Sequence, residues 1–125
     1  PGAAFFLPSM VDDGFFRGRS MAGTLVAAAG THVALDAFGL QAAAVGAVFT
    51  HPDYRGLGLA RDLMVALCRG LRAWGRDRAA PPLIGLNCAE ANTAANLLYE
   101  QLGFVPLLRY EEVQLSSARS RPPGV

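Results

Sequence analysis

The chain has 125 residues and a mass of 13.2 kDa, the size of one small domain. Hydrophobic residues make up 52% of the sequence, but no apolar run reaches the roughly 20 residues that a membrane-spanning helix needs, so we expect no membrane partner. The net charge of +1 arises from interspersed charges rather than a basic run, so we also expect no nucleic-acid partner.

The first elements in chain order predict antiparallel strands. Residues 1–13 hold a short apolar stretch that we interpret as the remnant of an upstream helix and turn. Phe15–Ser20 and Thr24–Leu35 have the spacing of two strands joined by a Gly-containing hairpin loop. Gln41–Thr50 is a nearly continuous run of small apolar residues, which predicts a strand buried on both faces.

Two helices and a short strand follow. Between Leu57 and Gly75, apolar residues recur at intervals of three and four with arginines opposite, which predicts an amphipathic helix that Pro81-Pro82 would stop. Leu83–Cys88 predicts a strand parallel to the previous one, because the helix makes a crossover connection. Ala91–Leu102 predicts a second helix, ended by Gly103.

The C-terminal part predicts closure of the sheet and then a tail. Phe104–Leu115 is expected to give one or two closing strands, and the polar, Pro-rich residues 116–125 are expected to be disordered. The sequence therefore predicts a single α/β domain over residues 14–115, with a mixed sheet flanked by helices.

The two cysteines, Cys68 and Cys88, are too few for a disulfide framework, and no secretory signal precedes them. We therefore expect a reducing, cytoplasmic location.

The junction after the Gln41–Thr50 strand is typical of an anion site. Arg55-Gly56-Leu57-Gly58-Leu59-Ala60 connects that strand directly to a helix, whose first N–H groups lack intrahelical acceptors and favour a negative charge. A Walker-type nucleotide loop does not fit, because the chain has no lysine to reach the outer phosphates. A dinucleotide fingerprint does not fit either, since the third glycine is absent.

The loop and a later segment together resemble one family. Arg55, Gly58 and Ala60 fill the pattern (Gln/Arg)-x-x-Gly-x-(Gly/Ala), which resembles the coenzyme A loop of the GNAT acetyltransferase superfamily. The segment from Asn92 to Phe104 resembles its second signature, Asn-x-x-Ala-x-x-Leu-Tyr followed by Gly-Phe. The resemblance is closest to a bacterial branch with a Gly-Thr-His strand before a Thr-His-Pro-x-Tyr-Arg-Gly loop.

The resemblance implies a GNAT-like mixed β-sheet, with antiparallel N-terminal strands and a splayed parallel central pair. Complete members have one strand and two helices ahead of the hairpin, which contribute much of the acceptor pocket. Only residues 1–13 are available for these elements here, so we expect the first strand and helices to be lacking. A partner copy in a homodimer, or a tandem domain, would then supply them.

The resemblance also implies a coenzyme A site and no metal. The strand before the loop would bind the pantetheine arm through its backbone, the loop would bind the pyrophosphate, and Asn92 would hydrogen-bond the cofactor. Asn87, at the end of the short strand, is a further candidate that could instead satisfy a backbone group where the two strands part. The residues that match these roles are Val48, Phe49, Thr50, Arg55, Gly56, Leu57, Gly58, Leu59, Ala60, Asn87, Asn92 and Tyr99. The matching tyrosine, Tyr99, would also be the general acid that protonates the departing thiolate.

The general base is less well specified by the sequence. The predicted strand Gln41–Thr50 holds no acidic residue, which leaves His32, His51 and Asp53. We take His32 as the candidate base and expect His51, next to a proline, to shape the loop. Cys88 is a poor candidate nucleophile, because no histidine is placed by sequence to activate it.

These features predict an acetyl-CoA-dependent N-acetyltransferase, in which a small-molecule or peptide amine attacks the thioester directly. The alternative from another class is a non-catalytic coenzyme A-binding domain, or half-domain of a larger or dimeric assembly. The sequence does not identify the acyl acceptor.

Overall fold

The computed structural model describes residues 14–113 and 115 as a mixed four-stranded sheet with helices. The elements in order are β1 (Phe16–Met21), β2 (Thr24–Ala37), β3 (Leu40–Thr50), the single 3₁₀ turn η1 (Pro52–Tyr54), α2 (Leu59–Trp74), β4 (Leu83–Leu86) and α3 (Thr93–Gln101). The predicted remnant at 1–13 and the predicted tail at 116–125 lie outside the described residues.

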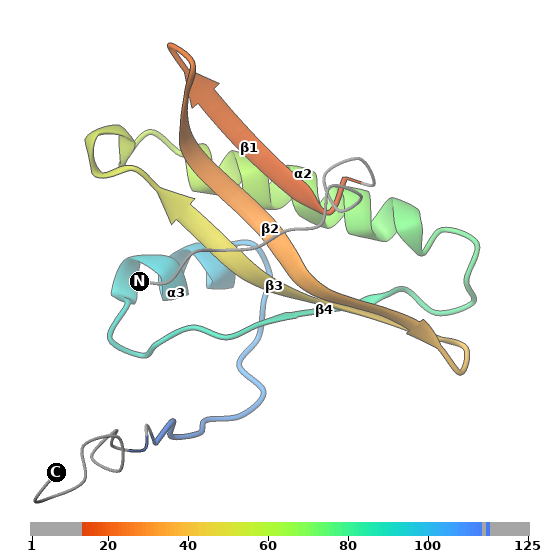
Figure 1. The fold of residues 1–125 in the computed structure, drawn as a ribbon. Coiled ribbons are helices and arrows are strands. Elements are labelled where there is room, and N and C mark those ends of the chain that lie inside the picture. Colours follow the sequence, from red (N-terminus) through yellow and green to blue (C-terminus); the bar gives the residue numbers. More distant parts are fainter. Residues whose placement is uncertain (1–13, 114, 116–125) are drawn as a thin grey trace, which may run out of the picture.

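The sheet has the order β1-β2-β3-β4, and it confirms the predicted fold class. The first three strands are antiparallel neighbours, and β4 pairs with β3 in parallel, as a helical crossover requires. Figure 1 shows α2 running along the sheet behind β1 and β2, with α3 on the other side of β3 in this view.

The core lies between α2 and the sheet. Five apolar residues of α2 are buried at helical spacing, and they face small residues of β2 and β3. Because alanines line much of this face of the sheet, the larger helix side chains reach the strand backbones closely. The buried helix residues are Leu59, Leu63, Met64, Leu67 and Leu71.

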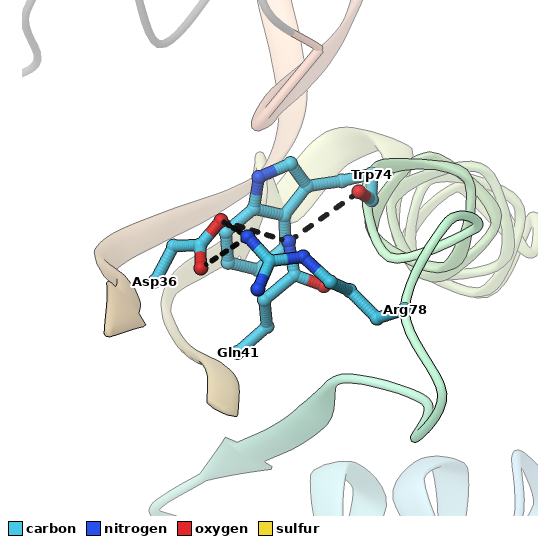
Figure 2. A network of polar contacts seen from close by, with 4 residues as sticks. All are labelled: Asp36, Gln41, Trp74 and Arg78. Carbon is cyan, nitrogen blue, oxygen red and sulfur yellow. Dashed lines mark hydrogen bonds and ion pairs between the residues drawn. The ribbon is translucent and has the colours of Figure 1, made fainter. Parts of the chain in front are cut away.

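A polar network fixes the connection from α2 to β4. The guanidinium of Arg78 donates to both carboxylate oxygens of Asp36, at 2.6 Å for Oδ1, and Gln41 Nε2 donates to Asp36 at 3.2 Å and to the Trp74 carbonyl at 3.4 Å (Figure 2). A Cβ on Gly75 would lie 2.5 Å from Pro82 Cδ, so the backbone passes close to the prolines here. These contacts hold the end of the β2–β3 hairpin against the segment that leads into β4.

Of two predicted helix ends, one has a different cause and one is as expected. The helix α2 ends at Trp74 with Gly75 as its cap, six residues before Pro81, so the glycine and not the proline pair stops it. Gly103, with φ of +97°, follows the last turn of α3 in the left-handed region, as predicted.

The closing strands predicted for Phe104–Leu115 are wrong for the described residues 104–113 and 115, which form neither strand nor helix. A strand needs a neighbour that accepts its backbone hydrogen bonds. The adjacent β4 is only four residues long, and Pro106 has no N–H to donate. Apolar residues of this segment, including Leu107 and Val113, are accordingly exposed.

The prediction that the Gln41–Thr50 strand is buried on both faces is also wrong. Gln41, Ala43 and Val45 are buried toward α2, whereas the residues between them are half-buried and Gly46 is exposed. An alanine-rich run has no hydrophobic alternation to reveal its two faces, because alanine occurs both inside and outside.

Candidate active site

The parallel pair β3 and β4 separates after four residues. Ala42–Val45 pairs with Leu83–Leu86, and β3 then continues from Gly46 to Thr50 with no described strand beside it on the β4 side. Antiparallel pairing to β2 uses only the backbone groups on the other side of β3. The split therefore leaves a free strand edge that an extended ligand can pair with.

A cavity of about 190 Å³ lies in this split. One wall comes from β3, and the opposite wall comes from the end of β4, the segment after it and α3. Its lining residues are Val45, Gly46, Val48, Leu86, Asn87, Cys88, Ala89, Asn92, Ala95 and Tyr99. Four residues predicted from the sequence, Val48, Asn87, Asn92 and Tyr99, are thereby brought together.

Tyr99 is the titratable group whose environment best suits proton donation. It is half-buried on α3, with its ring edge-to-face against Phe104 at a centroid distance of 6.0 Å. Burial raises the pKa of the Tyr99 hydroxyl, and the neighbouring charge of an ionised Cys88 raises it further. The hydroxyl therefore keeps its proton at neutral pH and can donate it.

Two asparagines organise the wall that carries Tyr99. The Oδ1 of Asn92 accepts from the Ala95 N–H at 3.3 Å as the N-cap of α3, so its amide nitrogen remains for other partners. The Nδ2 of Asn96 donates to the carbonyls of Ala89 and Asn92, both at 2.9 Å, and lies 3.4 Å from that of Glu90. Asn96 therefore fixes the segment between β4 and α3.

The glycine loop lies at the end of β3, beyond the cavity. Gly56 and Gly58 have φ near +79° and +78°, and no atom lies within 4 Å of where a Cβ would stand on either residue. Gly58 is the N-cap of α2 and provides no side-chain acceptor, so the first N–H groups of the helix face an open space. Such an arrangement favours an anion.

Arg55 connects this loop back to the strand. Its Nε donates to the Thr50 carbonyl at 3.0 Å, which leaves the other guanidinium nitrogens exposed at the loop. His51 accepts from the Asp53 N–H at 3.1 Å through Nδ1, so it shapes the turn as expected. Phe49 and Thr50 lie on the free part of β3 between the cavity and the loop, and the Phe49 side chain is 47% exposed.

His32 lies on β2, next to the β3 wall of the cavity. It does not line the cavity itself, but its ring occupies the space beside Gly46, which does. The predicted base is therefore at the edge of the same site as Tyr99, on a different wall.

A family model described as the acetyltransferase (GNAT) family matches residues 6–104. The chain belongs to the GNAT acetyltransferase family. The match includes both segments on which the resemblance was based, the glycine loop and the Asn92–Phe104 signature. Among curated proteins, none matches this sequence.

Solved structures of acetyltransferases share the fold. A putative GNAT acetyltransferase from Novosphingobium aromaticivorans is 36% identical, with a TM-score of 0.59, over 72% of this chain and 36% of its own. The ribosomal-protein-alanine N-acetyltransferase of Brucella melitensis biovar Abortus is 23% identical, with a TM-score of 0.59, over 86% and 76%. A putative acetyltransferase from Agrobacterium tumefaciens is 19% identical, with a TM-score of 0.63, over 86% and 74%.

Several cavity residues were missed by the sequence reasoning. Gly46, Cys88 and Ala89 gave no signal, because a glycine, a cysteine and an alanine near strand ends are common without any site. Asn96 does not line the cavity, but it fixes the segment that does, and the sequence analysis assigns it no role. Its position four residues after the N-cap Asn92 is the signal that could have identified it, since such a side chain can reach back to the preceding loop.

Within residues 14–113 and 115, no helix is long and apolar enough to cross a bilayer. The same residues contain no group of three or more histidine, cysteine or acidic side chains that could hold a metal ion.

Proposed function

We propose that this GNAT family member is an acetyl-CoA-dependent N-acetyltransferase that acetylates a primary amine of a small molecule or peptide. The observation that carries the proposal is the cavity in the β3–β4 split with the protonated Tyr99 hydroxyl on its wall. A proton donor beside a free strand edge suits a reaction in which a thiolate departs from an extended ligand.

The residues present fit coenzyme A. Its pantetheine arm is a chain of amides that can pair with the backbone of Val48, Phe49 and Thr50, and its pyrophosphate suits the open loop from Arg55 to Ala60. The neighbour AAC(6')-Iy, of the same fold, was solved with the bisubstrate analogue CoA-S-monomethyl-acetylneamine, at 17% identity and a TM-score of 0.58 over 81% of this chain and 68% of its own. We assign Asn87 and Asn92 as amide donors to the cofactor.

The proposed mechanism is direct transfer. When bound, acetyl-CoA supplies an acetyl group already activated as a thioester. The amine nitrogen bonds to the carbonyl carbon while the carbon–sulfur bond breaks, His32 takes a proton from the nitrogen, and Tyr99 gives its proton to the sulfur. No residue of the chain becomes acylated, so Cys88 has no role as a nucleophile.

Binding of acetyl-CoA is the first test. A ligand at 100 times its dissociation constant stabilises the folded state by about 2.7 kcal/mol, which raises the melting temperature measurably. Thermal unfolding with and without millimolar acetyl-CoA checks this, with ATP as the control phosphate ligand. Absence of any stabilisation by acetyl-CoA would contradict both the enzyme and the non-catalytic binder.

Turnover is the second test, and it separates the enzyme from the binder. We expect acetyl-CoA to release free thiol in the presence of an acceptor from a panel of small-molecule amines and peptides, with mass spectrometry showing the acetylated amine. Stabilisation by acetyl-CoA without transfer to any member of a broad panel would favour the non-catalytic coenzyme A-binding domain.

A further inference from the structure

The side chain of His32 fills the space that Gly46 leaves by having no side chain. A Cβ built on Gly46 would lie 1.6 Å from His32 Nδ1, 2.4 Å from Cε1 and 2.6 Å from Cγ. No real carbon approaches a ring so closely, so any larger residue at position 46 must displace the imidazole. The next closest approach, at Gly75, is 2.5 Å to Pro82 Cδ.

The sheet is irregular at the same place. Gly30 is paired with Ala47, but Thr31 is paired with Val45 and Val33 with Ala44, so neither His32 nor Gly46 has a direct partner in the ladder. This local irregularity accompanies the placement of the imidazole over the backbone of the neighbouring strand.

Backbone conformation does not require the glycine at position 46. Gly46 is not among the residues with positive φ, so an L-residue could adopt its conformation without strain. The requirement that remains is space. Gly85 on β4 offers a comparison, since it also lacks positive φ, yet nothing lies within 4 Å of where its Cβ would stand.

We propose that Gly46 is a positioning residue that seats the His32 imidazole at the edge of the cavity, where it takes the proton of the attacking amine. The inference rests on the function proposed above. Gly46 lines the cavity on the β3 wall and Tyr99 lines it from α3, so this position puts the base beside the wall opposite the acid.

The other titratable groups around this seat have separate roles or partners. On β2, Asp36 is paired with Arg78, and β3 carries no ionisable side chain. Beyond β4, Glu90 is paired with Arg109, while Cys88 and Tyr99 line the far wall. A base accepts a proton only in its unprotonated form, so the acid limb of the pH–rate profile reports on the base.

The experiment is a double-mutant cycle with Gly46→Ala, His32→Ala and the double variant, and with Gly85→Ala as the matched control. We expect Gly46→Ala and His32→Ala each to lower kcat by about 10²-fold, the usual size of an acid–base contribution, with KM for acetyl-CoA changed less than about twofold. Both should lose the fall in kcat/KM toward low pH. Gly85→Ala should keep the wild-type rate and profile.

The double variant shows whether Gly46→Ala acts through the His32 ring or independently of it. Because the ring is absent in His32→Ala, adding Gly46→Ala to it should lower neither kcat nor the melting temperature further, although Gly46→Ala alone lowers both. Additive losses in the double variant would contradict the positioning role of Gly46. A wild-type fall in kcat/KM toward low pH in Gly46→Ala would contradict it as well. Absence of acetyl transfer by the wild type would contradict both the proposed function and the role of His32. The melting temperatures of the four proteins in the cycle would then still test whether the His32 ring packs over Gly46.

Discussion

The two halves of the domain bury their side chains to very different degrees. The half made of β1–β3 and α2 contains every described residue that is both large and fully buried. The half made of β4 and α3 contains no buried residue in either element. The cavity lies on the boundary. One wall comes from the packed core, and the other, with Tyr99, comes from partly buried residues that pack on that core and from a segment held by the hydrogen bonds of Asn96. The packed half therefore supplies most of the buried core, whereas the candidate site draws residues from both halves.

The largest expected effect tests where the folding free energy resides. Leu67 of α2 is 0% exposed, so Leu67→Ala should cost about 2–5 kcal/mol of unfolding free energy. Leu97 of α3 is 54% exposed, so Leu97→Ala should change it by about 0.5 kcal/mol or less. Urea unfolding of the two variants measures both values, and equal losses would remove the contrast between the halves.

Tyr99→Phe should affect catalysis with little effect on stability, because it removes a proton donor from the lightly packed half. We expect kcat to fall by about 10²-fold while KM for acetyl-CoA stays nearly constant. Tyr110→Phe, which alters an exposed tyrosine outside the cavity, is the control and should leave kcat unchanged. Wild-type kcat in Tyr99→Phe would take the acid role away from this residue.

The raised pKa of Tyr99 fixes the sign of the pH dependence on the alkaline side. The hydroxyl must carry its proton to act, and its pKa lies above the ordinary tyrosine value of about 10, so activity should persist up to that pH and fall only beyond it. The unfolded chain ionises this group at lower pH than the folded one, so its stability contribution is full below about pH 10 and is lost as the pH rises through the folded pKa. A decline in kcat with rising pH that begins below pH 9, and that is absent from Tyr99→Phe, would contradict this assignment.

The glycine loop belongs to the packed half, and its substitution should have an intermediate effect. Gly58→Ala forces an alanine to φ near +78°, which costs about 1–2 kcal/mol. Gly39→Ala imposes the same strain in the β2–β3 turn, at φ of +75°, and is the matched control. Both should lower the unfolding free energy similarly, but only Gly58→Ala should weaken coenzyme A binding in calorimetry. Equal affinities in the two variants would separate the loop from the cofactor.

The smallest expected effect compares one cysteine from each half. Cys88 lines the cavity and Cys68 lies on α2, where burial raises its pKa despite the opposing charge of Arg72. Saturating coenzyme A should slow alkylation of Cys88 several-fold and leave the rate at Cys68 unchanged. Peptide mass spectrometry after timed treatment with iodoacetamide measures both sites in one sample. Protection of both cysteines alike would indicate a general stabilisation instead of a ligand in the cavity.

The same contrast explains what could be predicted from the sequence. The helix α2 has a clear apolar period and a core to bury it in, so its local pattern and its tertiary packing agree. The segment after Gly103 has apolar residues of strand type, but whether a strand forms depends on a neighbouring edge that local sequence does not describe. The accuracy of the prediction therefore fell where packing becomes sparse.

The candidate site divides in a similar way. Tyr99 and Asn92 are carried by a signature with fixed spacing along one helix, so their proximity follows from helical geometry. The contact between His32 and Gly46 depends on an irregular register between two strands, which no local pattern reveals. Residue types at fixed helical spacing can thus be placed from sequence, whereas cross-strand neighbours at a bulge require coordinates.

The early separation of β3 from β4 also has a consequence for the protein without ligand. Beyond Val45, alternate residues of β3 direct their backbone groups to a side with no described strand alongside, and such an unprotected edge is a template on which another polypeptide can build a sheet. An edge that can accept a pantetheine arm can equally accept a strand from a neighbouring molecule. Occupancy of the split would then also protect the protein from aggregation, so that solubility in the cell depends on how much of its ligand is present.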